Sequence, residues 1–135
     1  MNEESGKKKI LVIDDEEPTV ATLTAGLEKE GYEVFGAYTG EKGLQLAQTE
    51  RPDAIILDIF LPGEDGLSLL KKLKRPLDRE TGESSKTRGI PVIILTGYGK
   101  KMKEIFEMEK AFSFFTKPFE LKAILASVEK ALESK

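Results

Sequence analysis

Five short apolar runs alternate along the chain with five segments whose apolar residues recur at helical spacing, and this alternation limits the fold more than any other feature. The apolar runs occupy residues 10–13, 32–37, 54–57, 91–95 and 112–116. The helical segments occupy residues 18–31, 39–51, 67–73, 102–106 and 121–132. Strands that alternate with helices favour a parallel sheet with helices on both faces, because each right-handed crossover lays its helix against the sheet. We therefore predict a three-layer α/β/α fold on a five-stranded parallel sheet.

The run from Ala54 to Leu57 is the most informative strand. It contains no polar residue, Asp58 follows it directly, and the turn-rich segment 62–66 comes next. A short uninterrupted apolar run bounded by turn signals is typical of a strand buried on both faces. A carboxylate at the end of such a strand is costly unless something compensates its charge, so we expect Asp58 to have a partner.

Helix boundaries can also be predicted from single residues. Pro18 suits a first helical position, and Gly31 suits the end of the same helix. Thr39 is a candidate cap for the second helix, which the segment 51–53, Arg-Pro-Asp, should end. Residues 76–89 are polar and turn-rich, which predicts a loop.

Length, charge and composition exclude several classes of protein. At 135 residues the chain fits one domain, which we place at residues 9–133 behind a flexible tail of residues 1–8. The formal charge of −3 gives no general attraction to nucleic acid or anionic lipid. Cysteine and histidine are absent, which excludes disulfides, thiolate metal sites and a histidine proton shuttle. No apolar stretch suits a signal peptide or a membrane span, so we expect a cytoplasmic protein.

Polar residues follow four of the five predicted strands. Strand one is followed by Asp14 and Asp15, strand three by Asp58, strand four by Thr96 and strand five by Lys117. In an open parallel sheet, ligands bind outside the carboxyl ends of the strands, where the strand order reverses. With a strand order of 2-1-3-4-5, strands one and three are neighbours at that point. This order would bring the three aspartates together.

Three neighbouring carboxylates repel one another unless a cation compensates them. A hard divalent ion with oxygen ligands, Mg²⁺ before Ca²⁺, meets that requirement. Lys117 would add a second positive charge and Thr96 a hydroxyl donor. Acids, a hydroxyl and a lysine around one metal ion are typical of phosphoryl transfer, with Asp58 as the natural nucleophile.

The chain resembles the receiver domain of two-component response regulators, of the flavodoxin-like chemotaxis type. The resemblance covers about residues 8–133 and rests on four motifs in order: ILVIDDE (10–16), AIILDIFLPGEDG (54–66), PVIILTGYG (91–99) and FFTKPF (114–119). Each motif alone is weak, but all four on alternating strands are specific. The resemblance implies that Asp58 is a phosphoacceptor that takes a phosphoryl group from a phosphohistidine.

The resemblance also implies roles for other residues. Asp15, Asp58 and the backbone carbonyl of Phe60 would bind Mg²⁺, with Asp14 acting through water. Lys117 would pair first with the aspartate and then with its phosphoryl oxygens, and the bond before Pro118 would be cis.

Signalling would follow from a switch. Thr96 resembles the switch hydroxyl, and Phe114 resembles the aromatic residue that turns inward with it. The surface of the fourth helix, fifth strand and fifth helix would then change and control a partner protein.

Partners and activity follow from the same resemblance. It implies a sensor histidine kinase or phosphotransfer protein as the donor, a downstream protein target on the switched surface, and no direct binding to nucleic acid or membrane. A phosphorylation-dependent homodimer is a further option. The protein would not be an enzyme beyond its own aspartyl phosphorylation and dephosphorylation.

Two features differ from the family pattern. The 76–89 loop is longer than usual, and the chain between Thr96 and Lys117 is about one residue short. Residues 71–88 also carry seven basic and three acidic side chains, which would suit an acidic partner or a nucleotide but equally a solvated loop. At the family positions flanking the hydrolytic water lie Phe60 and Tyr98, and we hypothesise that they slow dephosphorylation.

Other interpretations of the same residues remain open. The aspartates, Thr96 and Lys117 could be ordinary strand-end groups, and Phe114 could be a core residue. The alternative function is a receiver-fold interaction module that is not phosphorylated. A phosphatase of small molecules is less favoured because Phe60 stands where such enzymes carry a second acid. A nucleotide-binding oxidoreductase is weaker still because no G-x-G-x-x-G follows the first strand.

Overall fold

The computed structural model describes residues 6–61, 66–75, 86–97 and 111–133. Within them lie the strands β1 (Lys9–Ile13), β2 (Glu33–Ala37), β3 (Ala54–Asp58), β4 (Val92–Thr96) and β5 (Ser113–Thr116). The helices in the same ranges are α1 (Glu17–Lys29), α2 (Gly40–Glu50), α3 (Gly66–Leu73) and α5 (Leu121–Glu133).

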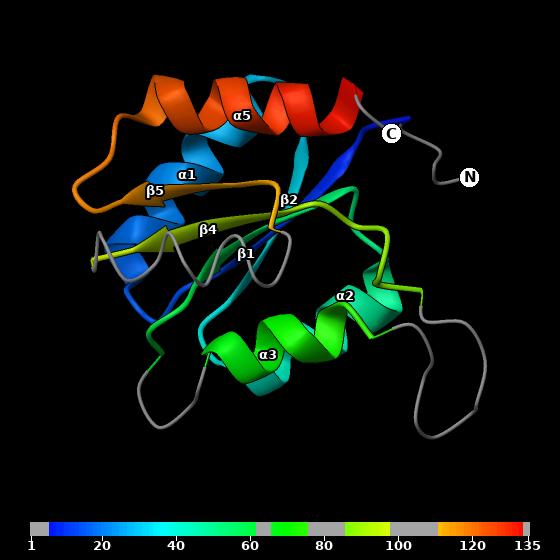
Figure 1. The fold of residues 1–135 in the computed structure, drawn as a ribbon. Helices are drawn as coiled ribbons and strands as arrows, with labels where there is room; N and C mark the ends of the chain where they lie inside the picture. Colours follow the sequence, from blue (N-terminus) through cyan, green and yellow to red (C-terminus); the bar gives the residue numbers. More distant parts are fainter. Residues whose placement is uncertain (1–5, 62–65, 76–85, 98–110, 134–135) are drawn as a thin grey trace.

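All five strands are parallel and lie in the order β2-β1-β3-β4-β5, which confirms the predicted sheet. The helices cover both faces: α1 and α5 lie on one side of the sheet, and α2 and α3 lie on the other (Figure 1). The predicted three-layer α/β/α architecture is therefore also confirmed. The carboxyl ends of all strands lie along one edge of the sheet, where the predicted polar residues follow them.

Local sequence signals account for several helix ends. The hydroxyl of Thr39 accepts a hydrogen bond from the backbone N–H of Lys42 at 3.1 Å and so caps α2 as predicted. The same helix ends at Glu50, and the capping residue Arg51 has a left-handed φ of 48°. Gly31, just past the end of α1, has a φ of 97°, which glycine adopts without steric cost. Pro18 occupies the second position of α1, one residue later than predicted, because the helix begins at Glu17.

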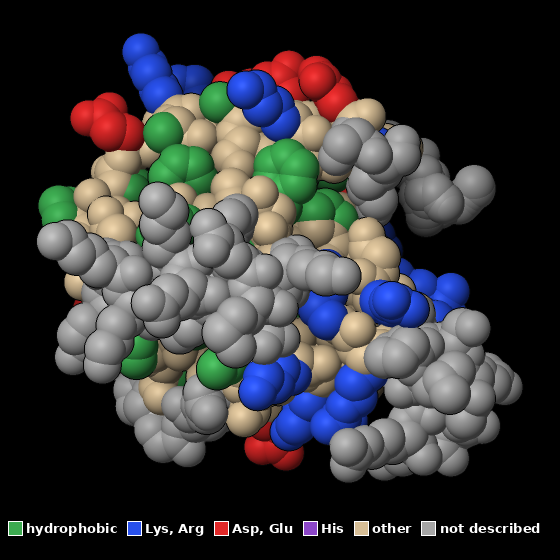
Figure 2. All heavy atoms as spheres, in the orientation of Figure 1, with side chains coloured by type: hydrophobic (Ala, Val, Ile, Leu, Met, Phe, Trp, Pro, Cys, Tyr) green, Lys and Arg blue, Asp and Glu red, His purple; other side chains and the backbone are tan. Residues whose placement is uncertain are grey.

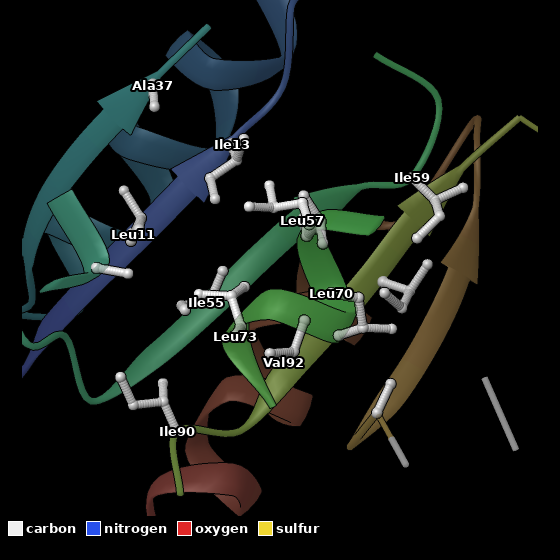
Figure 3. Close-up of a cluster of buried hydrophobic side chains, with 14 of the residues drawn as sticks. Leu11, Ile13, Ala37, Ile55, Leu57, Ile59, Leu70, Leu73, Ile90 and Val92 are labelled. Carbon is white, nitrogen blue, oxygen red and sulfur yellow. The ribbon is translucent and has the colours of Figure 1, made fainter. Parts of the chain in front are cut away.

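Alternate strand residues separate the core into two layers. Figure 3 shows one layer, in which Ile55 and Leu57 of β3 lie beside Leu70 and Leu73 of α3. The opposite faces of the strands pack against α1 and α5, for example Ile56 of β3. Every residue of β3 is buried, as the uninterrupted apolar run predicts. Full burial of each such side chain contributes about 1.5–3 kcal/mol, so β3 is firmly held and Asp58 with it.

Some predicted features fall outside the described residues. They are the helix around residues 102–106, Tyr98, and most of the 76–89 loop. The division into a tail of residues 1–8 and a domain of residues 9–133 stays a prediction. Among the helices that the structure describes, none has the length and apolar character needed to span a membrane.

Candidate functional site

The register of β1 and β3 brings the acidic residues together. Ile13 lies opposite Leu57, so the residues that follow them, Asp14 and Asp58, end neighbouring strands at the same edge. One carboxylate oxygen each from Asp14, Asp15 and Asp58 lies within 4.8 Å of the other two. Asp14 is 1% exposed and Asp58 is 5% exposed, whereas Asp15 is closer to solvent. The structure thus gathers the three predicted acids into one group.

Backbone amides fix the orientation of the two buried carboxylates. Oδ1 of Asp14 accepts a hydrogen bond from the backbone N–H of Glu16 at 2.9 Å. Oδ1 of Asp58 accepts one from the backbone N–H of Phe60, also at 2.9 Å. Each carboxylate therefore has one oxygen held by the following turn, and its Oδ2 is directed to other partners.

Lys117 lies between these carboxylates and a third acid. Its Nζ is 2.9 Å from Oδ2 of Asp14 and 3.1 Å from Oδ2 of Asp58. It also donates a hydrogen bond to Oε1 of Glu16 at 2.7 Å, the shortest of the three contacts. The peptide bond from Lys117 to Pro118 is cis, as the resemblance implies. The lysine therefore compensates two buried negative charges and is itself held by an exposed one.

The ionisation of these groups follows from their surroundings. Burial raises the pKa of Asp58, and the nearby Asp14 adds to that effect, while the Phe60 amide and Lys117 oppose it. Burial alone would lower the pKa of Lys117, but its contacts with the three carboxylates outweigh burial and raise it. The hydrogen bond from Lys117 lowers the pKa of Glu16. The raised pKa of Lys117 keeps its ammonium charged, whereas the raised pKa of Asp58 means that burial opposes ionisation of its carboxylate.

The donor set fits a divalent cation. Oδ2 of Asp14 is buried and lies 2.9 Å from Nζ of Lys117, but no described residue offers it a hydrogen-bond donor in suitable geometry. Four carboxylates and one ammonium leave a formal charge of −3 in the group. Closely spaced carboxylate oxygens of this kind are the ligands that Mg²⁺ prefers. The residues present can therefore hold such an ion, with Asp58 as one of its ligands.

The predicted switch residues lie on β4, which neighbours β3, and on β5, the next strand of the sheet. Thr96 ends β4 and is fully buried. Its backbone carbonyl accepts a hydrogen bond from the N–H of Lys117 at 2.7 Å, which ties the end of β4 to the lysine. Phe114 of β5 lies opposite Ile94 of β4. Its side chain is partly buried and packs against the core layer next to α3. Phe60 is 46% exposed beside Asp58.

A glycine ties the start of α3 to the residue that follows Asp58. The N–H of Gly66 donates to the backbone carbonyl of Ile59 at 3.1 Å. A Cβ at Gly66 would lie 2.1 Å from that carbonyl oxygen. Only glycine fits there without moving the backbone, so this residue helps to place Phe60 at the acidic group.

Sequence reasoning missed Glu16 as a member of the site. Its contact with Lys117 joins residues 101 positions apart in the chain. The available signal was its place directly after Asp14 and Asp15, since a third consecutive acid at the end of β1 must lie near the same edge.

Comparisons with known proteins agree with this geometry. A family model described as the response regulator receiver domain matches residues 10–129. The chain is similar to the solved chemotaxis response regulator CheY4 of Vibrio cholerae, with 26% identity, a TM-score of 0.80, and coverage of 93% of this chain and 99% of that one. A putative response regulator from Chloroflexus aurantiacus is 32% identical, with a TM-score of 0.79 and coverage of 94% and 98%. The receiver domain of a signal transduction histidine kinase from Syntrophus aciditrophicus is 28% identical, with a TM-score of 0.78 and coverage of 94% and 91%.

Proposed function

Because the family model matches most of its length, this chain belongs to the response regulator receiver domain family, and we propose that its Asp58 accepts a phosphoryl group from a phosphohistidine of a sensor kinase or phosphotransfer protein. In that step an oxygen of Asp58 attacks phosphorus, the new O–P bond forms as the N–P bond breaks, and the departing imidazole takes up a proton. One observation carries the proposal: a buried carboxylate, fixed at the end of a rigid strand, lies 3.1 Å from a lysine and beside two further acids.

Residues of this chain would supply positioning and charge. Asp15, Asp58 and the Phe60 carbonyl would bind Mg²⁺, with Asp14 acting through water. When bound, the ion would offset the negative charge of the phosphoryl oxygens and the aspartates. The amide of Phe60 orients the attacking carboxylate, because it already donates to Oδ1 of Asp58. These contacts exist before the donor arrives, so little reorganisation is needed during the reaction.

Phosphorylation would then redistribute the contacts of Lys117. A phosphoryl group brings several strong acceptor oxygens, which compete with Glu16 and Asp14 for the ammonium. Thr96, on the adjacent strand, would bond to the same group, and Phe114 would repack with it. The change would alter the surface of helix four, β5 and α5, and a downstream protein that prefers the altered surface would read the signal.

Further parts of the proposal concern activity and assembly. We propose no turnover of a separate substrate, since the phosphoryl group enters and leaves Asp58 itself. A phosphorylation-dependent homodimer and a cytoplasmic location remain predictions.

Phosphorylation by a small donor tests the proposal directly. Wild type, Asp58→Asn and a matched control, Asp53→Asn, are incubated with acetyl phosphate and Mg²⁺ and weighed by mass spectrometry. Asp53 suits the control because its carboxylate accepts a hydrogen bond from the N–H of Lys9 at the opposite edge of the sheet. We expect one added phosphoryl group on wild type and on the control, and none on Asp58→Asn. No gain on any of the three would favour the interaction module that is not phosphorylated.

A further inference from the structure

A concentrated basic surface lies at the carboxyl end of α3. The basic patch consists of residues 71–75 and 86–88, in which six of eight residues are Lys or Arg and none is acidic. Since the formal charge of the whole chain is −3, all other residues together carry −9. Figure 2 shows Lys and Arg side chains gathered on this part of the molecule. The charge of the protein is therefore unevenly distributed.

Hydrogen bonds hold the two halves of the patch together. The hydroxyl of Thr87, which is 4% exposed, donates to the backbone carbonyl of Leu73 at 2.8 Å. Nζ of Lys74 donates to the carbonyl of Arg88 at 3.2 Å and to that of Ile90 at 2.5 Å. These bonds cross from the end of α3 to the segment before β4. The patch is thus built into the fold and does not depend on a partner to bring its halves together.

Within the described part of the chain, the side chains of the other five cations have no polar partner. In the ranges that the structure describes, no side-chain hydrogen bond or ion pair involves Lys71, Lys72, Arg75, Lys86 or Arg88. Cations in the last turn of a helix interact favourably with its dipole, which is a structural reason for Lys71 and Lys72. It does not explain Lys86 and Arg88, which lie outside the helix. Like charges in one cluster repel one another, and an external anionic group would relieve that repulsion.

The position of the patch separates it from the phosphorylation site. α3 runs antiparallel to the strands, so its end and the start of β4 lie at the edge of the sheet opposite Asp58 (Figure 1). A partner can bind there without covering the acidic group. The negative charge of the remaining surface would repel a long polyanion such as nucleic acid, whereas a short acidic segment can contact the patch alone.

We propose that the basic patch docks an acidic segment of a partner protein. The docking would steer encounter through long-range attraction and would weaken as ionic strength rises, because exposed charges are screened beyond about 8 Å at physiological salt. The proposal does not rest on phosphorylation of Asp58, so either can fail without the other.

The test uses a short fluorescent oligoglutamate peptide as probe and an oligothymidylate of equal length as competitor. Binding is followed by fluorescence anisotropy at low and physiological salt, and the contact surface is mapped from amide chemical shifts. The variant is Lys71→Glu/Lys72→Glu/Arg88→Glu. The matched control, Lys29→Glu/Lys42→Glu/Lys130→Glu, makes the same change in net charge at exposed positions of α1, α2 and α5. Thermal unfolding checks that both fold.

The expected result is peptide binding that shifts amides in residues 71–75 and 86–90. We expect the patch variant to lose affinity by at least about tenfold, while the control stays within about twofold of wild type. An equal loss in both variants would show attraction to net charge alone and would overturn the proposal. So would tighter binding of oligothymidylate to the same residues, or the absence of localised shifts.

Discussion

The dependence of the acidic group on Lys117 leads to a quantitative prediction for Lys117→Met. Methionine keeps an unbranched chain of similar length but removes the ammonium, which lies 2.9 Å from Asp14 and 3.1 Å from Asp58. Removal of one partner from a buried ion pair costs about 3–5 kcal/mol, because the remaining charge is left uncompensated. The side chain of Lys117 is 19% exposed, so we place the loss of unfolding free energy near the lower end, at about 3 kcal/mol.

Mg²⁺ should reduce that loss. The oxygens that face Lys117 are also candidate ligands of the ion, so the variant lacks a competitor for the site. A ligand present at about 100 times its dissociation constant adds about 2.7 kcal/mol to the stability of a protein that binds it only when folded. We therefore expect the deficit of Lys117→Met to be large in EDTA and smaller in saturating Mg²⁺.

Urea unfolding of wild type and variant in EDTA and in Mg²⁺ measures both quantities. Lys122→Met, at an exposed position of α5, is the matched control and should change stability by no more than about 0.5 kcal/mol. The reasoning is refuted if Lys117→Met loses less than about 1 kcal/mol in EDTA. It is also refuted if the deficit is the same with and without the ion.

Three further predictions concern neighbours of this lysine. Burial raises the pKa of Asp58 above its ordinary value of 3.8, so the folded state binds the Asp58 proton more tightly than the unfolded state does. This proton binding stabilises the folded protein fully below pH 3.8, and the stabilisation is lost as pH rises through the raised pKa. The stability of Asp58→Asn relative to wild type should therefore rise from about pH 4, near the ordinary carboxyl pKa, to about pH 7, as measured by urea unfolding in EDTA. A difference that is the same at both pH values would contradict burial as the cause. Gly66→Ala should cost about 1–3 kcal/mol in urea unfolding, because its Cβ would meet the Ile59 carbonyl at 2.1 Å; unchanged stability would show that the loop yields freely. Glu16→Gln should accelerate phosphorylation by acetyl phosphate by less than about tenfold, because the exposed Glu16 carboxylate no longer competes with the phosphoryl oxygens for Lys117. Slower phosphorylation would mean that Glu16 positions the lysine.

Several features of this protein could be predicted from local sequence alone. Apolar periodicity predicts the alternation of strands and helices, since each period corresponds to one way of burying a face. Thr39 and Gly31 signal helix ends because their side chains, or the lack of one, act on the adjacent backbone. The position of the acids at the ends of β1 and β3 follows from the same patterns. The resemblance to receiver domains then gave the strand order that places them together.

The distances within the site could not be read from these patterns. Side-chain directions at the meeting point of separate strands decide whether Lys117 bonds to Glu16. They also decide how the lysine divides its contacts among the three acids. The burial that raises the pKa of Asp58 likewise comes from all the surrounding elements at once.

The basic patch shows the same division between sequence and structure. Its sequence left an acidic partner, a nucleotide and a solvated loop as open interpretations, because charge alone does not say which residues are near one another. The bonds from Thr87 to Leu73 and from Lys74 to Arg88 decide that two separate segments form one surface. Sequence determined where polar groups could occur, since periodicity acts over neighbouring residues. Tertiary structure decided which groups meet, because contacts between distant residues depend on the packing of the whole fold.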